Sequence, residues 1–262
     1  MTRHSSVLIT GASSGIGATY ADRFAHRGHD LVLVARDRDR LEALAARLRQ
    51  ECGIGVEVLQ ADLTQPGNLN EVGQRLREDP RIEVLVNNAG ASLLGSFVDQ
   101  TTDDVGRLIS LNTTAPARLA SAIAPRLMRA GQGSIINIGS VVGLAPEFGA
   151  TVYGATKAFM LFLSQGLNLE LGPKGVYVQA VLPAATRTEI WARAGLDENA
   201  LPPLMEVGEL VDAALAGYDR REPVTIPALH DVRQWEAFEA ARQAMLPGFG
   251  NTRAAERYQP AS

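Results

Sequence analysis

The chain has 262 residues, of which 46% are hydrophobic and 21% charged, a composition that excludes a disordered chain and is typical of a globular protein. Its net charge of −4 argues against a basic surface for nucleic acid or an anionic membrane. The single cysteine, Cys52, excludes an intramolecular disulfide and favours a reducing compartment. The first apolar run is too short for a signal peptide, and no later run approaches the roughly 18 residues of a membrane span, so we expect a cytoplasmic protein.

Short runs of β-branched and other apolar residues alternate with longer amphipathic stretches along the chain. Strands are expected at residues 7–10, 30–35, 56–60, 82–86, 134–138, 176–182 and 223–226. Helices are expected at residues 18–27, 37–50, 66–78, 102–129 with a break near Pro116, 153–171, 206–216 and 231–245. The alternation predicts an α/β fold, namely a doubly wound parallel sheet (Rossmann fold) of about seven strands with helices on both faces.

The chain shows no internal repeat, low-complexity segment or linker. We therefore expect one domain over residues 1–250, within the size range of parallel α/β folds. Residues 251–262 carry no clear pattern and are expected to form a flexible tail.

A glycine-rich turn follows the first expected strand and opens the first expected helix, in the order Thr-Gly-Ala-Ser-Ser-Gly-Ile-Gly. Gly11, Gly15 and Gly17 allow a tight turn and a close approach of the backbone to a ligand. Unpaired N–H groups and the positive dipole end at a helix start favour a pyrophosphate. The alternative is an ordinary turn in which Ser13 or Ser14 caps the helix. Because the loop lies in the first strand-to-helix turn, its position favours a dinucleotide site.

The end of the second expected strand bears on the choice of dinucleotide. A fold of this kind that binds NAD usually ends this strand with an acid for the ribose hydroxyls, whereas here Ala35 is followed by Arg36. A guanidinium at this place could pair with a 2′-phosphate, with assistance from Arg38 or Arg40. An ordinary charged helix start with Asp37 as its N-cap is the alternative, but it leaves the missing acid unexplained. We therefore expect one NADP(H)-binding domain, with NAD(H) as the second choice.

A hydroxyl, a phenol and an ammonium form the candidate catalytic trio. Tyr153 and Lys157 are four residues apart and would share one face of a helix, and Ser140 lies thirteen residues before Tyr153. The Lys157 charge near the phenol would lower the pKa of Tyr153 from its usual value of about 10. Taken singly, Tyr153 is more often a half-buried aromatic and Lys157 a solvated surface charge. The trio supports proton transfer to or from a carbonyl oxygen.

Two further motifs complete a pattern. Residues 87–90 read Asn-Asn-Ala-Gly after the fourth strand, and the trio follows the fifth. With the glycine loop, in this order and spacing, the chain resembles the short-chain dehydrogenase/reductase family, in its single-domain type of about 250 residues. The resemblance covers residues 7–188, with weaker support to residue 245. Asp62 matches the acid that the family places near the adenine, and Asn112 matches its fourth catalytic residue. Alone, Asp62 could be a loop cap and Asn112 a buried helix asparagine.

The resemblance implies a role for each catalytic residue. Tyr153 would be the general acid in reduction and the base in oxidation, and Lys157 would lower its pKa and bind the nicotinamide ribose. Ser140 would donate a hydrogen bond to the substrate oxygen, and Asn112 would hold a water on the proton path. The implied cofactor contacts are Gly11, Ser13, Ser14, Gly15, Ile16, Gly17, Arg36, Asp62, Leu63, Asn88, Ala89, Gly90, Tyr153, Lys157, Pro183, Ala184, Thr186 and Thr188.

One position departs from the family pattern, which has Pro-Gly after the sixth strand. Here Ala184 follows Pro183, and an alanine excludes backbone angles that glycine allows, so the loop could shift and weaken the contact expected of Thr188. Arg187 could contact cofactor or substrate, or be only a surface charge.

The substrate side is expected in a lid at residues 186–205. Trp191, Ile190 and Leu196 would line an apolar pocket with Val142, Leu144 and Phe148. Equally, these residues could simply seal the domain against solvent. The four histidines show no metal-ligand spacing, so no metal site is expected.

The expected helix at 153–171 is apolar nearly all round, which predicts burial on several sides. In the resembled family it forms a subunit interface with the preceding helix, so a homodimer or homotetramer is expected. The predicted function is hydride transfer between NADP(H) and a carbonyl or secondary alcohol. The alternatives are an epimerase or dehydratase on the same fold, which usually carries a larger C-terminal domain, and a non-catalytic NADP(H) sensor, which would lack part of the trio.

Overall fold

The computed structural model describes residues 5–93, 95–189, 191 and 203–258. Its contacts divide the chain into two compact units, Met1–Pro227 and Ala228–Ser262. The first unit carries the sheet and all the expected site residues. The second contains α9 (Val232–Ala244) and two short 3-10 turns, Leu246–Gly250 and Glu256–Tyr258. The expected extent of one domain, residues 1–250, stays a prediction.

The first unit is built on a seven-stranded sheet in the order β3-β2-β1-β4-β5-β6-β7, with every neighbouring pair parallel. The strands are β1 (Ser6–Thr10), β2 (Asp30–Ala35), β3 (Val56–Gln60), β4 (Ile82–Asn87), β5 (Ser134–Ile138), β6 (Tyr177–Val181) and β7 (Val224–Thr225). Strands β1, β5 and β6 are buried along their whole length, as a sheet covered on both faces requires. The doubly wound fold is confirmed. Its strand order reverses between β1 and β4, which opens a crevice at the carboxyl ends of those strands.

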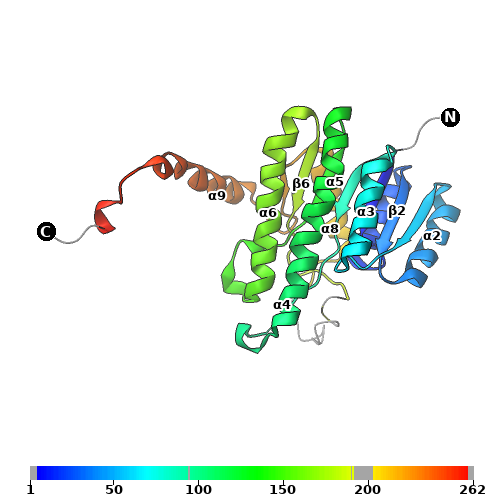
Figure 1. Cartoon of the computed structure of the whole chain (residues 1–262), viewed down its shortest axis with the longest axis horizontal. Coiled ribbons are helices and arrows are strands. Elements are labelled where there is room, and N and C mark those ends of the chain that lie inside the picture. Colours follow the sequence, from blue (N-terminus) through cyan, green and yellow to red (C-terminus); the bar gives the residue numbers. More distant parts are fainter. Residues whose placement is uncertain (1–4, 94, 190, 192–202, 259–262) are drawn as a thin grey trace. The chain divides into compact units, whose positions relative to one another are not determined.

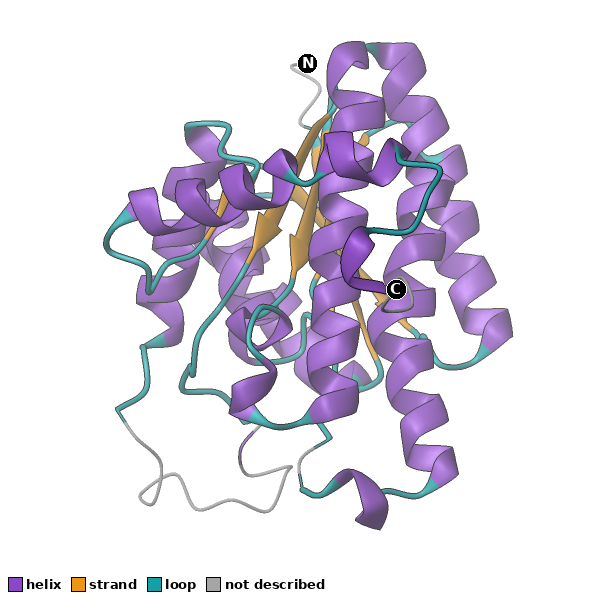
Figure 2. Cartoon of the chain, turned by 90° about the vertical axis from the view of Figure 1, so that its left-hand side faces the viewer, coloured by secondary structure: helices purple, strands orange, loops and turns teal. Residues whose placement is uncertain are grey.

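Helices cover both faces of the sheet (Figures 1 and 2). On one face, α1 (Gly15–His26), α2 (Arg38–Cys52) and α8 (Val207–Asp219) bury residues such as Phe24, Leu48 and Leu210. On the other, α3 (Pro66–Glu78), α5 (Ala115–Ala130) and α6 (Thr151–Leu171) lie side by side, and the core there includes Leu76 and Leu119. The arrowheads of the strands in Figure 2 point the same way. Because parallel strands end at one edge of the sheet, the expected site residues that follow the strands lie at that edge.

The expected helix at 102–129 is interrupted, as predicted, but the interruption is a π-helical turn just before Pro116. Helix α4 (Thr102–Ile109) leads into a π-helical turn, Ser110–Thr114, before α5 begins. Pro116 is the second residue of α5, directly after the π-helical turn. The π-helical turn carries Asn112, and such turns often occur at functional sites.

The expectation that the helix at 153–171 is buried on several sides is wrong for the single chain. Phe162 and Leu169 of α6 are 80% and 78% exposed, whereas Val152, Met160 and Leu161 are buried. The helix is apolar all round, but only one stripe of it can face the sheet and the neighbouring helices. Among the described residues, no helix is long and apolar enough to cross a membrane.

Candidate active site

The glycine loop between β1 and α1 is held by polar contacts from the end of β4. The Asn88 side chain donates two hydrogen bonds, to the carbonyls of Thr10 (2.9 Å) and Gly11 (3.2 Å). The Thr10 hydroxyl accepts from the backbone N–H groups of Asn88 and Ala89, both at 3.0 Å. Asn88 and Ala89, expected to contact a cofactor, therefore also fix the shape of the loop.

The glycines of the loop are required by its geometry. Gly11 and Gly15 adopt positive φ angles of 67° and 53°. A Cβ on Gly17 would overlap the Gly11 carbonyl oxygen. Helix α1 begins at Gly15 directly after the Ser13–Ser14 turn, and the Ser14 side chain makes no capping hydrogen bond, so the alternative of a cap is wrong for Ser14. The start of α1 thus presents N–H groups that the helix itself cannot pair, as an anion site needs.

Asp62 lies after β3, at the neighbouring strand end. Its Oδ1 accepts from the N–H (2.9 Å) and the hydroxyl (2.7 Å) of Thr64, the loop-cap arrangement that was the alternative to an adenine contact. Burial acts to raise the pKa of Asp62, but the Thr64 hydrogen bonds and the nearby Arg36 charge leave it below its usual value. The Leu63 and Ile16 side chains pack into the two cores.

The arginines after β2 differ in their partners. Arg38 lies 3.8 Å from Glu42, and Arg40 binds both carboxylate oxygens of Glu189, at 2.7 and 2.9 Å. Arg36 is exposed at the strand end and forms no ion pair with any described residue. Of the three, Arg36 is therefore the one whose guanidinium is left for a ligand.

The expected N-cap of α2 is confirmed. The Asp37 carboxylate accepts from the backbone N–H of Arg40 at 3.1 Å. Asp37 is thus explained by the start of the helix, and this explanation does not extend to Arg36.

The trio comes together at the carboxyl ends of β5 and β6. Ser140 begins the 3-10 turn Val141–Gly143, its Oγ accepting from the Val142 N–H at 3.2 Å and donating to the Pro183 carbonyl at 3.3 Å. Tyr153 and Lys157 share one face of α6, with the Lys157 ammonium 5.5 Å from the centre of the Tyr153 ring. Lys157 is buried and donates to the Ile138 carbonyl at 3.0 Å.

Burial shifts the two titrating groups of the trio in opposite directions. It raises the pKa of Tyr153 to about 12, against a lowering hydrogen bond with Ser140. It lowers the pKa of Lys157 to about 8. The expected lowering of the Tyr153 pKa by Lys157 is wrong for this structure: burial raises that pKa, and the opposing contribution comes from the Ser140 hydrogen bond. Desolvation disfavours the charged form of each group. At neutral pH the phenol keeps its proton and Lys157 keeps most of its charge.

Asn112 is buried and joined to both sides of the site. Its Nδ2 donates to the Ala91 carbonyl (2.9 Å) and to the Thr156 hydroxyl (3.1 Å), and its Oδ1 accepts from the Ala91 N–H at 3.0 Å. A Cβ on Gly90 would lie 3.3 Å from the Asn112 Oδ1 and 3.7 Å from the Lys157 Nζ. Gly90 therefore lets the amide and the ammonium approach the same space.

The start of α6 is shaped by two left-handed residues and one close contact. Gly149 and Ala150 have φ angles of 72° and 54°, and Ala150 precedes the first residue of the helix. A Cβ on Gly143 would come within 2.6 Å of the Lys157 and Ala158 backbone, so the Ser140 turn packs directly on the helix. This packing brings Ser140 within reach of Tyr153.

The segment after β6 lies against the glycine loop. A Cβ on Gly15 would be 3.4 Å from the Thr188 methyl group. Thr186 is buried and pairs with Met205 in an isolated parallel bridge. Ala184 does not have a positive φ, so the alanine in place of the family glycine is accommodated without strain.

The expected substrate side is described in part. Val142 and Leu144 are partly exposed in and after the Ser140 turn, and Phe148 is 68% exposed. The Trp191 indole donates to the Thr186 carbonyl at 2.7 Å, which directs it back to the segment after β6. Of the lid at 186–205, residues 190 and 192–202, with Ile190 and Leu196, lie outside the described residues.

Several supporting polar residues were missed in the sequence. Asn137, fully buried in β5, accepts from Asn87 and donates to Ser164 of α6, both at 2.9 Å. Thr156 binds Asn112, and Thr10 binds the end of β4. Polar residues inside otherwise apolar strands and helices were the available signal, because such groups need partners when buried.

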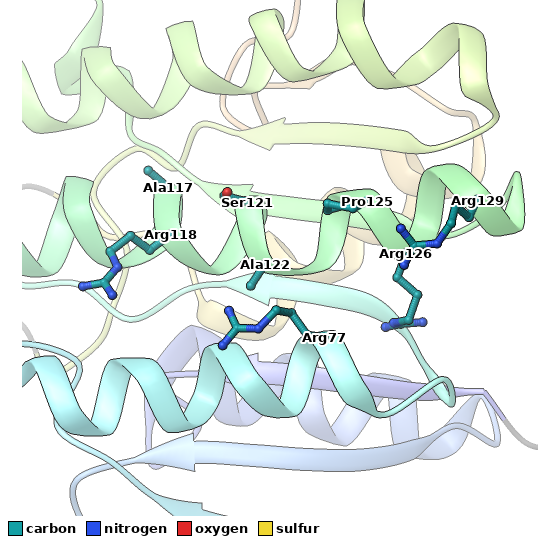
Figure 3. Close-up of a pocket in the computed structure, with 8 residues that line it drawn as sticks. All are labelled: Arg77, Ala117, Arg118, Ser121, Ala122, Pro125, Arg126 and Arg129. Carbon is teal, nitrogen blue, oxygen red and sulfur yellow. The ribbon is translucent and has the colours of Figure 1, made fainter.

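A groove between α3 and α5 contains none of the expected site residues. The groove between α3 and α5 measures about 610 Å³ (Figure 3) and is lined by Arg77, Ala117, Arg118, Ser121, Ala122, Pro125, Arg126 and Arg129. Two of its arginines serve the fold: Arg126 donates to the carbonyls of Leu76 and Ile82, and Arg118 to Asn70. Within the described residues, no group of three His, Cys, Asp or Glu could hold a metal ion.

The chain is similar in sequence and structure to known short-chain dehydrogenases. A model of the family described as short chain dehydrogenase matches residues 5–199. The chain is 67% identical to a short-chain dehydrogenase from Sphingobium yanoikuyae solved in complex with NADPH, over 97% of this chain and 100% of that one, with a TM-score of 0.96. It is 59% identical to the bulky-bulky ketone specific alcohol dehydrogenase from Comamonas testosteroni, over 99% and 100% of the two chains, with a TM-score of 0.93.

The chain belongs to the short-chain dehydrogenase family and is an oxidoreductase of that family. The matched residues run from β1 through the glycine loop and the trio to the segment after β6. Among curated relatives, the very-long-chain 3-oxoacyl-CoA reductase of Anas platyrhynchos is 32% identical over 190 residues. The match covers 70% of this chain and 60% of that protein.

The buried Lys157 should make stability depend on pH. Its pKa is about 8 in the folded protein and 10.5 when unperturbed, so over this range the unfolded chain binds more protons and stability rises with pH. Relative to Lys157→Met, the wild-type free energy of unfolding should rise by about 2 kcal/mol from pH 7 to pH 9.5. Urea unfolding of both proteins across this range measures the difference, and a constant difference would show that burial does not shift Lys157.

Proposed function

We propose that this protein is an NADP(H)-dependent carbonyl reductase or alcohol dehydrogenase in which Tyr153 is the general acid and base. The observation that carries the proposal is the placement of Ser140, Tyr153 and Lys157 at the same end of the sheet as a glycine loop that could hold a dinucleotide. A sensor without catalysis would not need a buried ammonium beside a phenol. Oxidation of NADPH by the purified protein with a range of aldehydes and ketones is the direct test.

The residues at the crevice fit a nicotinamide dinucleotide. The glycines at 11 and 17 leave the space that side chains would fill, and the start of α1 offers N–H groups to a pyrophosphate. Arg36, exposed and without an ion pair among the described residues, suits a 2′-phosphate. The Sphingobium relative was solved with NADPH, which supports the same choice here.

The bound coenzyme would supply or accept the hydride, and the protein would handle the proton. In reduction, Tyr153 donates its proton to the carbonyl oxygen while the Ser140 hydroxyl turns from the Pro183 carbonyl, 3.3 Å away, and donates a hydrogen bond to the same oxygen. The Lys157 charge, 5.5 Å from the phenol ring, stabilises the phenolate that remains. The Asn112 Oδ1, near the Lys157 ammonium across Gly90, would hold a water that returns the proton.

A bulky ketone or its secondary alcohol is the substrate class that we propose. The Comamonas relative, at 59% identity, is specific for ketones with two bulky substituents. The partly exposed Val142 and Leu144 and the exposed Phe148 offer apolar surface next to Ser140 for such groups. A cytoplasmic location stays a prediction.

Tyr153→Phe is expected to lower turnover by about 10²- to 10⁴-fold, because it removes the proton donor, and to leave the Kd for NADPH within about twofold. Steady-state NADPH oxidation and fluorescence titration measure the two effects. Undiminished turnover of Tyr153→Phe would remove Tyr153 from the mechanism.

Arg36→Ala is expected to weaken NADPH binding by about 10- to 100-fold and NADH binding by less than about twofold, because only NADPH carries the 2′-phosphate. Titration of both coenzymes into both proteins measures this. Arg38→Ala serves as the control, since its guanidinium lies beside Glu42. Equal losses for NADPH and NADH would refute the assignment of Arg36.

A homodimer or homotetramer is the assembly that we propose, formed through exposed apolar side chains of α4, α5 and α6. These side chains are Ile109, Met128, Phe159, Phe162 and Leu169. Phe162→Asp is expected to lower the molecular mass in solution, because a carboxylate would be buried without a partner in the interface. Light scattering at micromolar concentration measures the mass, with circular dichroism to verify folding. A wild-type protein of monomeric mass would contradict the proposal.

A further inference from the structure

The segment that follows β6 crosses the crevice between two fixed points. We name residues Pro183–Glu189 the strap. At its first end the Pro183 carbonyl accepts from the Ser140 hydroxyl (3.3 Å) and the Val141 N–H (3.0 Å). The strap therefore begins at the catalytic trio.

The middle of the strap lies on the glycine loop. Backbone hydrogen bonds join Arg187 N–H to the Met205 carbonyl (2.9 Å) and Met205 N–H to the Ala185 carbonyl (3.0 Å). Thr188 then lies against Gly15, at the start of α1. The strap therefore packs on the loop beside the helix start at which the proposed coenzyme would place its pyrophosphate.

At the far end of the strap, Glu189 forms an ion pair with Arg40 of α2, which also lies 3.4 Å from Asp37. Arg40 Nη1 donates to both Glu189 oxygens, at 2.7 and 2.9 Å, between residues 149 positions apart in the chain. Arg40 lies in the first turn of α2, just beyond Arg36, the proposed 2′-phosphate ligand. The ion pair thus links the strap to the adenosine side of the crevice.

We propose that Arg40 and Glu189 are positioning residues that hold the strap across the crevice and so slow the release of the coenzyme. The inference rests on the proposed function, since it assumes that NADP(H) binds there. Each side chain is about half exposed, at 50% and 46%. An exposed pair adds little to the stability of a fold, but this one would lie beside the proposed coenzyme, so its loss would act on the rate of release.

The test is a double-mutant cycle on coenzyme release. NADPH and NADH are displaced from Glu189→Gln, Arg40→Gln, the double variant and the wild type by excess oxidised coenzyme, and the loss of bound-coenzyme fluorescence gives the rate. Each single variant should release both coenzymes about two- to fivefold faster, and the double variant no faster than either. Arg27→Gln is the control, because Arg27, the residue after α1, also binds both oxygens of a carboxylate from a distant segment, Asp219 at the end of α8 (2.9 and 3.0 Å). Its release rates should equal those of the wild type.

Different outcomes overturn different claims. Unchanged release from Glu189→Gln, or additive effects in the double variant, would refute the ion pair as a tie for the strap. An effect of Arg40→Gln on NADPH but not on NADH would make Arg40 a ligand of the 2′-phosphate instead, and would also refute it. If the wild type binds neither coenzyme, the proposed function fails and the strap inference with it.

Discussion

The hydrogen bonds between Thr10 and the Asn88–Ala89 segment join the carboxyl ends of β1 and β4, where the strand order reverses. A parallel sheet opens into a crevice at the point where its strand order reverses. The loops that line this crevice are held in place by these hydrogen bonds. Asn88 pairs the loop carbonyls, and Gly11 and Gly17 let the loop lie close to β4. The geometry of the expected cofactor site therefore depends on one buried polar cluster that also completes the sheet.

A second set of buried amides places the catalytic helix. Asn137 of β5 binds Ser164 of α6, and Asn112 of the π-helical turn binds Thr156 of α6. Each contact is a buried side-chain hydrogen bond, costly to leave unmade, so α6 cannot slide along the sheet without loss. This fixes Lys157 beside Tyr153, where burial opposes charge on both groups. The raised pKa of the phenol and the lowered pKa of the ammonium follow from the same lack of water.

Local signals account for much of the fold and of the candidate site. The apolar strands, the helix beginning at Pro66 and the Asp37 cap were predictable, because periodicity and capping act over a few neighbouring residues. The gathering of the glycine loop, Ser140 and Tyr153 at one edge was also predictable, because parallel strands end together. The exposed side of α6 was not predictable, because its apolar residues look the same whether they face the sheet, solvent or another subunit.

By itself the sequence determined the parallel α/β class, the order of the motifs along the crevice and the chemical groups available for proton transfer. Each of these follows from residue type and short-range spacing. Only the tertiary structure decided which groups are buried and which charges are already paired. The sequence does not distinguish Arg36 from Arg40; the contact of Arg40 with Glu189 in the folded chain does. In the same way, the raised pKa of Tyr153 follows from its burial in the folded chain. Such outcomes depend on desolvation and on contacts between distant segments, which no local pattern encodes.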